Sequence, residues 1–449
     1  MAEINKAIRG TNDVLPKDSF KWQFIEKKVI ETARLFGFKE IRVPVFEHTE
    51  VFTKSVGDTT DVVQKEMYTF DDKGGRSITL RPELTAGVIR SVIEHGLFND
   101  ALPLKVCYIG GCYRYEKPQA GRLREFHQFG VECVGAAEPG ADAEVILLAK
   151  HLLDQLEVKD LSLEINSIGC PECRKEYHTA LKEYFNSKKE NLCNTCLERL
   201  ERNPMRILDC KCPECKEVSK NAPVIIDYLC DECNQHFSRV KEHLDAADVK
   251  YSVNPGIVRG LDYYTRTVFE FVSGKIGAQA TVCGGGRYDG LVAQMGGPQT
   301  PSLGFGMGIE RLLMVLESQE FEYPAESSVD VYIASIGNQA LSESTKLATM
   351  LRNEGFSVLT DIVGRGFKAQ MKYANKIDAK YLVVIGEDEI KNQTCNLKNM
   401  STGQQKQVAL PDGLVSAVYD EQLNTALSQL TDSVTDAEND LLNIKLGEN

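Results

Sequence analysis

The sequence predicts an α+β protein built from several domains, and three observations lead to this fold class. The chain has 449 residues, more than one ordinary hydrophobic core sustains. Nine of its 14 cysteines fall between Cys170 and Cys233, which marks a compact insert within a region of mixed helix and strand patterns. Strand and helix patterns alternate again after residue 329, which predicts a small α/β domain with a partly parallel sheet.

These changes of pattern predict five segments. The boundary near FEYPAESSVD, residues 321–330, is typical of a linker because it combines Pro and Ser with mixed charge. The segments are the two parts of the main α+β domain, the Cys-rich insert between them, the α/β domain and an acidic tail: 1–169 and 246–325, 170–245, 329–412, and 413–449.

Composition limits the class of function. The chain is 42% hydrophobic and 26% charged, with neither a signal-peptide pattern at its start nor an apolar run long enough to span a bilayer, so we expect a cytoplasmic protein without a membrane partner. The net charge of −13 counts against a non-specific DNA binder, and we expect no DNA partner. Local basic faces for a specific RNA remain compatible with this charge.

The α/β domain contains one basic pattern with two interpretations. Four lysines spaced by four residues predict a stripe on a helix: Lys368, Lys372, Lys376 and Lys380. The apolar face of the same helix is predicted to comprise Phe367, Met371, Ala374, Ile377 and Tyr381. Periodicity alone favours a solvated face, whereas 10 basic against 8 acidic residues in 329–410 favour an RNA-backbone contact. In the tail, a short helix is expected from Leu423, Leu427, Leu430 and Leu441, with no assigned function.

Two runs in the first part carry polar residues near turns. In TLRPELTAG, residues 79–87, Glu83 and Thr85 could face a small ligand with an amino group; the alternative is a helix start capped by Thr79. Residues 113–135 alternate around a loop and predict a hairpin. Arginines near its turn would suit phosphate, and its polar strand residues would need a ligand if they point inward; the alternative is an exposed hairpin with surface charges.

Arg259 and the adjacent Tyr263 and Tyr264 precede a predicted strand in GIVRGLDYYTRTVFEF. Neighbours on a strand face opposite sides, so only one tyrosine would line a pocket unless the chain turns there. The alternative is that these are core and interface aromatics.

Two Gly-rich runs follow. CGGGRYDGLV permits close approach of the backbone to a ligand, but it matches neither a Rossmann fingerprint nor a P-loop. GFGMGIERLLMVL begins a helix with Glu310 and Arg311. An arginine at this end opposes the helix dipole, which nearby phosphate would explain.

In order and content, these runs resemble the histidyl-tRNA synthetase family of class II aminoacyl-tRNA synthetases, over roughly residues 5–410. IRVPVFEHTEVF is similar to motif 1, the dimer-interface element; the hairpin is similar to motif 2 and GFGMGIERLL to motif 3. RGLDYY and CGGGRYDGL are the more specific runs. The resemblance implies a catalytic domain with an antiparallel sheet and helices, an anticodon-binding α/β domain and a homodimer.

The family's reaction ligates L-histidine to tRNA(His) through a histidyl-adenylate, with ATP and Mg²⁺ as the substrate complex. The resemblance implies that Arg114 and Arg259 are catalytic and flank the α-phosphate. It implies that ATP is bound by Arg114, Glu116, Arg122 and Arg311. It implies a histidine pocket of Glu83, Leu84, Thr85, Arg114, Gln128, Glu132, Arg259, Tyr263, Tyr264 and Tyr288.

Two rival functions stay open at this point. One is a synthetase-like regulatory subunit of histidine biosynthesis, which binds histidine without charging tRNA. It is disfavoured because that family lacks the anticodon domain, whereas this chain keeps an α/β C-terminal domain together with Arg114, Arg259 and Arg311. The other is a zinc-dependent nucleic-acid-binding module, which the acidic balance disfavours.

The cysteines of the insert depart from the family's usual pattern. They form four Cys-x-x-Cys pairs, at Cys170/Cys173, Cys193/Cys196, Cys212/Cys215 and Cys230/Cys233. Two such pairs complete a tetrahedral structural Zn²⁺ site, so eight cysteines predict two sites, with Cys210 left over or substituting. Spacing does not reveal which pairs share a metal ion, and the alternative is free buried cysteines. By resemblance, the insert lies over the acceptor end of tRNA.

Overall fold

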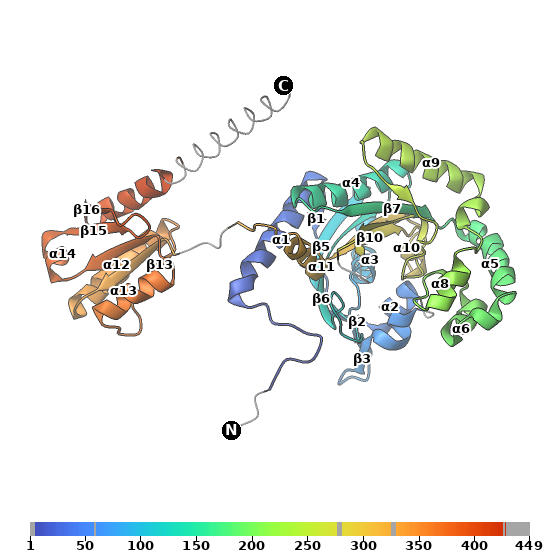
Figure 1. The fold of residues 1–449 in the computed structure, drawn as a ribbon, viewed down its shortest axis with the longest axis horizontal. Helices are drawn as coiled ribbons and strands as arrows, with labels where there is room; N and C mark the ends of the chain where they lie inside the picture. Colours follow the sequence, from blue (N-terminus) through green and yellow to red (C-terminus); the bar gives the residue numbers. More distant parts are fainter. Residues whose placement is uncertain (1–4, 58–59, 276–280, 325–328, 425–426, 428–449) are drawn as a thin grey trace. The chain divides into compact units, whose positions relative to one another are not determined.

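The computed structural model describes residues 5–57, 60–275, 281–324, 329–424 and 427 (Figure 1). Two compact units make up the chain, Met1–Tyr323 and Pro324–Asn449, called here the first and second units. The first unit combines helices with mainly antiparallel sheets and the second combines helices with a mixed sheet, which confirms the α+β fold class. Among the described residues, no helix has both the length and the apolar character needed to cross a membrane.

An eight-stranded sheet forms the centre of the first unit. From edge to edge its strands are β1 (Lys39–Glu40), β5 (Leu104–Tyr113), β6 (Glu125–Val134), β11 (Ser302–Gly308), β10 (Thr281–Arg287), β9 (Thr265–Ser273), β7 (Leu161–Ser167) and β8 (Ser252–Val253). Neighbours from β5 to β7 are antiparallel, and only the two short edge strands pair in parallel. A smaller sheet contains β2 (Phe46–His48), β4 (Ser77–Leu80) and β3 (Tyr68–Asp71).

Period-two alternation gives the large sheet two different faces. Phe129 and Val131 on β6 and Phe305 and Met307 on β11 are buried on one face. The helices that share this core are α1 (Pro16–Leu35), α4 (Pro139–Gln155), α9 (Asp231–Ala246) and α11 (Ile309–Ser318). The other face, which carries the intervening polar and glycine positions, is bordered by α2 (Thr49–Val56), α3 (Thr85–Glu94) and α10 (Leu291–Gln294). The functional residues belong to this second face.

The cysteine-rich insert is helical and shares its core with the main domain. Its helices are α5 (Pro171–Asn186), α6 (Asn194–Arg202), α7 (Met205–Leu208), α8 (Pro213–Ser219) and the start of α9. The insert also has the short 3-10 turns η3 (Lys189–Asn191) and η4 (Ile225–Tyr228), whereas η1 (Val62–Glu66) and η2 (Leu97–Asn99) belong to the main domain. Buried Tyr177, Leu181 and Ile207 of the insert belong to the same apolar cluster as Tyr263 and Tyr264. The insert therefore packs close to the polar face of the sheet.

The second unit contains a five-stranded sheet. Its strand order is β13 (Val358–Thr360), β12 (Val331–Ser335), β14 (Tyr381–Ile385), β15 (Thr394–Asn399) and β16 (Gln405–Ala409). β13, β12 and β14 run parallel, β15 pairs antiparallel with β14, and β16 pairs antiparallel with β15, so the prediction of a partly parallel sheet is confirmed. Its helices are α12 (Asn338–Asn353), α13 (Phe367–Lys376), α14 (Glu387–Asn392) and residues 412–424.

The predicted lysine helix is shorter than its periodicity indicated. α13 ends at Lys376, because the chain then turns through Asp378 with a positive φ of 48°. Lys380 and Tyr381 therefore lie outside the helix: the Lys380 ammonium is 2.8 Å from an Asp330 oxygen, and Tyr381 begins β14. The stripe consists of three lysines, and Phe367 on the predicted apolar face is exposed.

The acidic tail also begins later than residue 413. Leu414, Ala417 and Val418 are buried in the core of the second unit, because their spacing places them on one face of the helix over residues 412–424. Leu423 and Leu427 are exposed. Leu430 and Leu441 lie outside the described residues.

Candidate active site

A cavity of about 490 Å³ opens at the polar face of the eight-stranded sheet. It brings together ten of the side chains predicted from sequence: Glu83, Thr85, Arg114, Glu116, Arg122, Gln128, Arg259, Tyr263, Tyr264 and Arg311. The other three, Leu84, Glu132 and Tyr288, do not line this cavity but are buried next to residues that do. These side chains come from stretches more than 200 residues apart, so the fold rather than local sequence assembles the site.

Glycines on β10 and β11 make room for these side chains. A Cβ atom at Gly304 would meet the Glu132 carboxylate and the Val131 carbonyl oxygen, and one at Gly306 would meet the Gln128 amide. A Cβ at Gly284 would lie 2.5 Å from the Arg259 guanidinium. The Gly-rich runs therefore serve close approach of functional side chains to the sheet backbone.

Four arginines give one part of the cavity a concentrated positive charge. Burial and the neighbouring guanidinium groups of Arg114 and Arg122 lower the pKa of Arg311 from its ordinary value. Arg311 starts α11 and donates to the carbonyl oxygens of Gly121, at 3.0 Å, and Thr281, at 2.9 Å. Repelling cations held this closely favour a polyanionic ligand.

Arg259 lies where the chain turns before β9, with a φ of 56°. Its guanidinium pairs with the Glu270 carboxylate, which also accepts a hydrogen bond from the Thr281 hydroxyl at 2.7 Å. The buried Nε of Arg259 has no hydrogen-bond partner among the described residues, so it is available to an anion. Sequence reasoning missed Glu270, since an acidic residue on an alternating strand resembles ordinary surface charge.

Both tyrosines of RGLDYY line the cavity, because residues 261–264 form a turn rather than a strand. Their ring centroids are 4.7 Å apart, and the Arg259 guanidinium lies 5.4 Å from the centre of the Tyr264 ring. The sequence predicted that both rings could line one pocket only if the chain turns at these residues, and the structure has this turn.

Glu132 is a buried carboxylate without a cationic partner among the described residues. Burial raises its pKa to about 8, although hydroxyl groups that donate to it oppose this shift. Tyr288 and Tyr108 both donate, the latter at 2.8 Å. Sequence reasoning missed Tyr108, whose position opposite Gly130 on β6 becomes visible only from the strand register. A buried acid with two hydroxyl donors can accept an N–H from a ring.

Glu83 caps the start of α3. Its carboxylate accepts hydrogen bonds from the backbone N–H groups of Thr85, at 2.7 Å, and Ala86, at 2.8 Å. Burial raises the pKa of Glu83 above its ordinary value despite these bonds. The expected helix start is therefore present and also lines the cavity, while Thr79 is part of β4 rather than the cap.

The motif-2-like hairpin consists of β5, β6 and the loop between them. Arg114 follows β5, donates to the Pro82 carbonyl oxygen at 2.8 Å and stacks over Phe126, 5.1 Å from the ring centre. In the loop, Arg122 forms an ion pair with the buried Glu116 carboxylate. The two side chains, both predicted to bind ATP, thus contact each other at the cavity.

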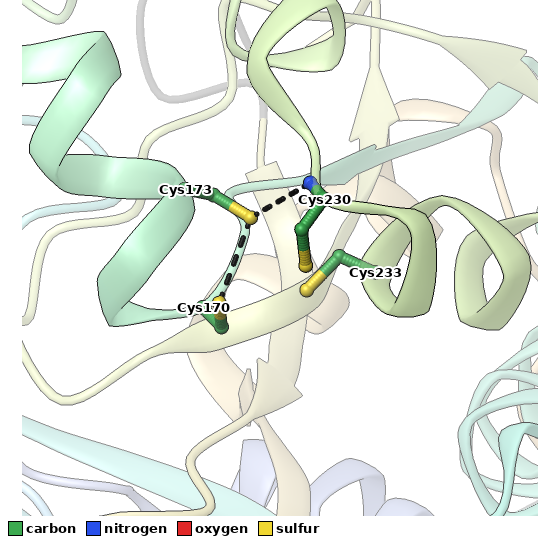
Figure 2. Close-up of side chains that lie close together, drawn as sticks. All are labelled: Cys170, Cys173, Cys230 and Cys233. Carbon is green, nitrogen blue, oxygen red and sulfur yellow. Dashed lines mark hydrogen bonds between the residues drawn. The ribbon is translucent and has the colours of Figure 1, made fainter.

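The insert's cysteines form two groups, each with four sulfur atoms within 4.8 Å of one another. Figure 2 shows the first, in which Cys170 and Cys173 at the start of α5 face Cys230 and Cys233 at the start of α9. The second group is Cys193, Cys196, Cys210 and Cys215. Cys210 thus takes the place that the pair spacing gave to Cys212, because the Cys212 thiol turns away to an oxygen of Glu214 at 2.7 Å.

Comparison with known proteins agrees with this geometry. The family described as Histidyl-tRNA synthetase matches residues 10–312, and the Anticodon binding domain matches residues 330–417. Proteins named Histidine--tRNA ligase in Acetivibrio thermocellus and Clostridium novyi are both 54% identical to this chain, over 92% and 90% of its length and 99% and 96% of theirs.

A solved structure is similar over almost the same span. The crystal structure of apo S. aureus histidyl-tRNA synthetase matches with a TM-score of 0.79 and 40% identity, covering 92% of this chain and 100% of that one. The family match spans well over half of the chain, and it includes the arginines, tyrosines and glycines that form the cavity. The chain belongs to the histidyl-tRNA synthetase family.

Proposed function

We propose that this chain ligates L-histidine to tRNA(His) in two steps, with histidyl-adenylate as the intermediate. The observation that carries this proposal is the convergence of Arg114, Arg122, Arg259 and Arg311 on one cavity beside the buried Glu132 carboxylate. The arginines suit a polyphosphate, and the buried acid with its tyrosine donors suits an imidazole ring. The family relationship supports the same assignment.

In the first step, a carboxylate oxygen of histidine attacks the α-phosphorus of ATP. The new bond joins that oxygen to phosphorus, the bond to the bridging oxygen of the β-phosphate breaks, and pyrophosphate leaves. Both reactants are anions, so the chain's main contribution is charge neutralisation and alignment rather than proton transfer. Arg114 and Arg259 flank the reacting phosphate, and Arg122 and Arg311 hold the departing phosphates.

Histidine is selected by groups that bind its imidazole ring and groups that bind its amino group. Glu132 and Tyr264 address the imidazole nitrogens, with Gln128, Tyr263 and Tyr288 completing the pocket. Glu83 and Thr85 face the amino group beside Leu84. Burial of Glu132 makes an apolar side chain costly, because such a ligand leaves the carboxylate without its N–H partner.

ATP enters as its Mg²⁺ complex, in which phosphate oxygens and water supply most ligands. The acidic groups of the cavity agree with that role, because Glu270 is paired with Arg259 and Glu310 with His127 rather than forming a separate metal cage. Glu116 contacts the adenine ring. Structural Zn²⁺ in the cysteine-rich insert completes the set of cofactors.

The second unit reads the anticodon, and the three lysines of α13 contact the RNA backbone. Two chains form a homodimer through the region that resembles motif 1, where Val45 and Phe46 expose 41% and 56% of their surface. The reaction takes place in the cytoplasm, where tRNA, histidine and ATP meet.

Histidine-dependent ATP–pyrophosphate exchange, followed by charging of tRNA(His), tests the proposal. We expect exchange with histidine, none with other amino acids, and transfer of the histidyl group to tRNA. Histidine binding without exchange would instead support the regulatory-subunit function. RNA binding by a chain that neither binds histidine nor catalyses exchange would support the zinc-module function.

A further inference from the structure

We infer that the insert holds two structural zinc ions and that the inner ion fixes the part of the insert that borders the catalytic cavity. The outer site consists of Cys170, Cys173, Cys230 and Cys233 (Figure 2). The inner site consists of Cys193, Cys196, Cys210 and Cys215. Each site is closed by four thiolates, so neither zinc has an open position for a substrate.

The spacing of the sulfur atoms fits zinc rather than disulfides. The sulfurs of Cys170 and Cys173 are 3.6 Å apart, and those of Cys193 and Cys210 are 3.9 Å apart. A tetrahedral site with Zn–S bonds of about 2.3 Å separates its sulfurs by about 3.8 Å. A disulfide requires about 2.05 Å, and all of these cysteines are free.

Backbone N–H groups already reach one sulfur in each group. The Cys230 N–H donates to the Cys173 sulfur at 3.1 Å, and the Cys193 N–H donates to the Cys215 sulfur at 3.3 Å. Each bond crosses from one half of its group to the other. Cys170, Cys193 and Cys230 each immediately precede a helix, so each four-sulfur group is anchored at helix starts.

The surroundings of Cys210 and Cys212 decide which of them is the inner ligand. Cys210 is buried within the sulfur group. Cys212 is more exposed, and its sulfur lies 2.7 Å from a Glu214 carboxylate oxygen, where a thiolate would be repelled. Zinc is therefore bound through Cys210 and Cys215, a pair with four intervening residues, and not through the Cys-x-x-Cys pair that contains Cys212.

The two sites have different mechanical roles. The outer site joins the two ends of the insert, at the starts of α5 and α9. The inner site lies just beyond α7, whose Arg206 donates to the Gly260 carbonyl oxygen at 2.8 Å and to Asp262 at 2.9 Å. Gly260 and Asp262 belong to the turn between Arg259 and Tyr263, so the inner zinc positions this catalytic turn through Arg206.

The matched cysteines provide a direct test of the ligand sets. Zinc per chain is measured by elemental analysis on the full chain, purified under reducing conditions. We expect two zinc ions in the wild type, two in Cys212→Ser and one in Cys210→Ser. A wild-type content near zero would overturn the inference, as would loss of one zinc from Cys212→Ser with two retained in Cys210→Ser.

A spectroscopic measurement covers the case in which Cys210→Ser fails to fold. Co²⁺ is exchanged into the full-length wild type and into Cys212→Ser, and the thiolate-to-cobalt absorption is compared. Equal intensity per chain supports the inner site through Cys210. A halved intensity in Cys212→Ser contradicts it.

The link to the catalytic turn rests on the proposed function, so it needs a separate readout. Arg206 lines the cavity as well as holding the turn, so two variants are compared. Arg206→Ala and Asp262→Ala, which removes the partner of Arg206 on the turn, should both retain two zinc ions but lower kcat/KM for histidine in pyrophosphate exchange by about tenfold to a hundredfold, because the turn shifts. Arg202→Ala, on the exposed surface of α6, is the matched control and should change neither value. Normal exchange in either Arg206→Ala or Asp262→Ala overturns the link, whereas absent exchange in the wild type with two zinc ions overturns only the proposed function.

Discussion

Arg259→Ala removes the guanidinium that lies at the turn before β9 and lines the cavity. The loss of one preorganised donor to a developing charge costs about 3–4 kcal/mol, or a factor of about 10²–10³ in rate. An arginine that neutralises a transferring phosphoryl group contributes about 10³–10⁵. The Arg259 side chain is only 17% exposed, where screening by water is weak. We therefore expect histidine-dependent pyrophosphate exchange to fall by about 10³-fold or more.

The same substitution leaves the Glu270 carboxylate without its ion-pair partner, and this effect on stability must be separated from the effect on rate. Breaking a fully buried ion pair costs about 3–5 kcal/mol of folding stability. Glu270 is 19% exposed and keeps its hydrogen bond from Thr281, so we expect a smaller loss, about 1–2 kcal/mol. Thermal unfolding should therefore show a folded protein with a modestly lower Tm.

The double variant Arg259→Ala/Glu270→Gln distinguishes the two explanations. If the single variant is slow only because a stranded carboxylate repels ATP, neutralising that carboxylate restores exchange. If Arg259 itself stabilises the developing charge, the double variant stays about as slow as the single one. Recovery of the double variant to within about tenfold of the wild-type rate would refute the role given to Arg259.

Three further predictions use other parts of the chain. Glu132→Gln should raise KM for histidine. Burial raises the pKa of Glu132 from its ordinary 4.5 to about 8, so the wild type without histidine should lose stability relative to this variant as the pH rises between these values. Tm curves that stay parallel over this pH range would contradict the shift. Gly304→Ala should lower stability and raise KM for histidine, because its Cβ meets Glu132 and the Val131 carbonyl oxygen. Gly290→Ala is the control and should leave stability and KM unchanged, because a Cβ there has nothing within 4 Å. Equal behaviour of the two variants would be inconsistent with this packing. Removal of residues 329–449 should spare pyrophosphate exchange but impair tRNA charging, and full charging would exclude an anticodon role for the second unit.

Sequence patterns identified the fold class and most of the cavity because the relevant residues lie within short, ordered motifs. Arg114 and Arg122 lie in the loop of a hairpin that is predicted by alternation, and Arg311 stands out because its charge opposes a helix dipole. Glu270 and Tyr108 carried no such signal. Their importance depends on strand pairing between distant segments, which local periodicity does not encode.

The predictions of the end of α13 and of the cysteine pairing were wrong for a related reason. The four-residue spacing of lysines continued past the end of α13, because spacing alone does not register the turn at Asp378. Likewise, the Cys-x-x-Cys pattern selected Cys212, although three-dimensional packing turns its thiol toward Glu214. In both cases, the residue spacing in the sequence stays regular at a position where the three-dimensional structure does not.

The glycines explain how one sheet serves both as a core and as a catalytic surface. On β6 and β11, odd-numbered residues such as Val131 and Phe305 are large and buried, and they fix the sheet against α4 and α11. Their even-numbered neighbours Gly304 and Gly306 leave space for the carboxylate of Glu132 and the amide of Gln128. Larger residues there would push these groups away from the backbone. The rigid face therefore holds the strands, while the glycines allow polar groups to approach closely enough to recognise a ligand.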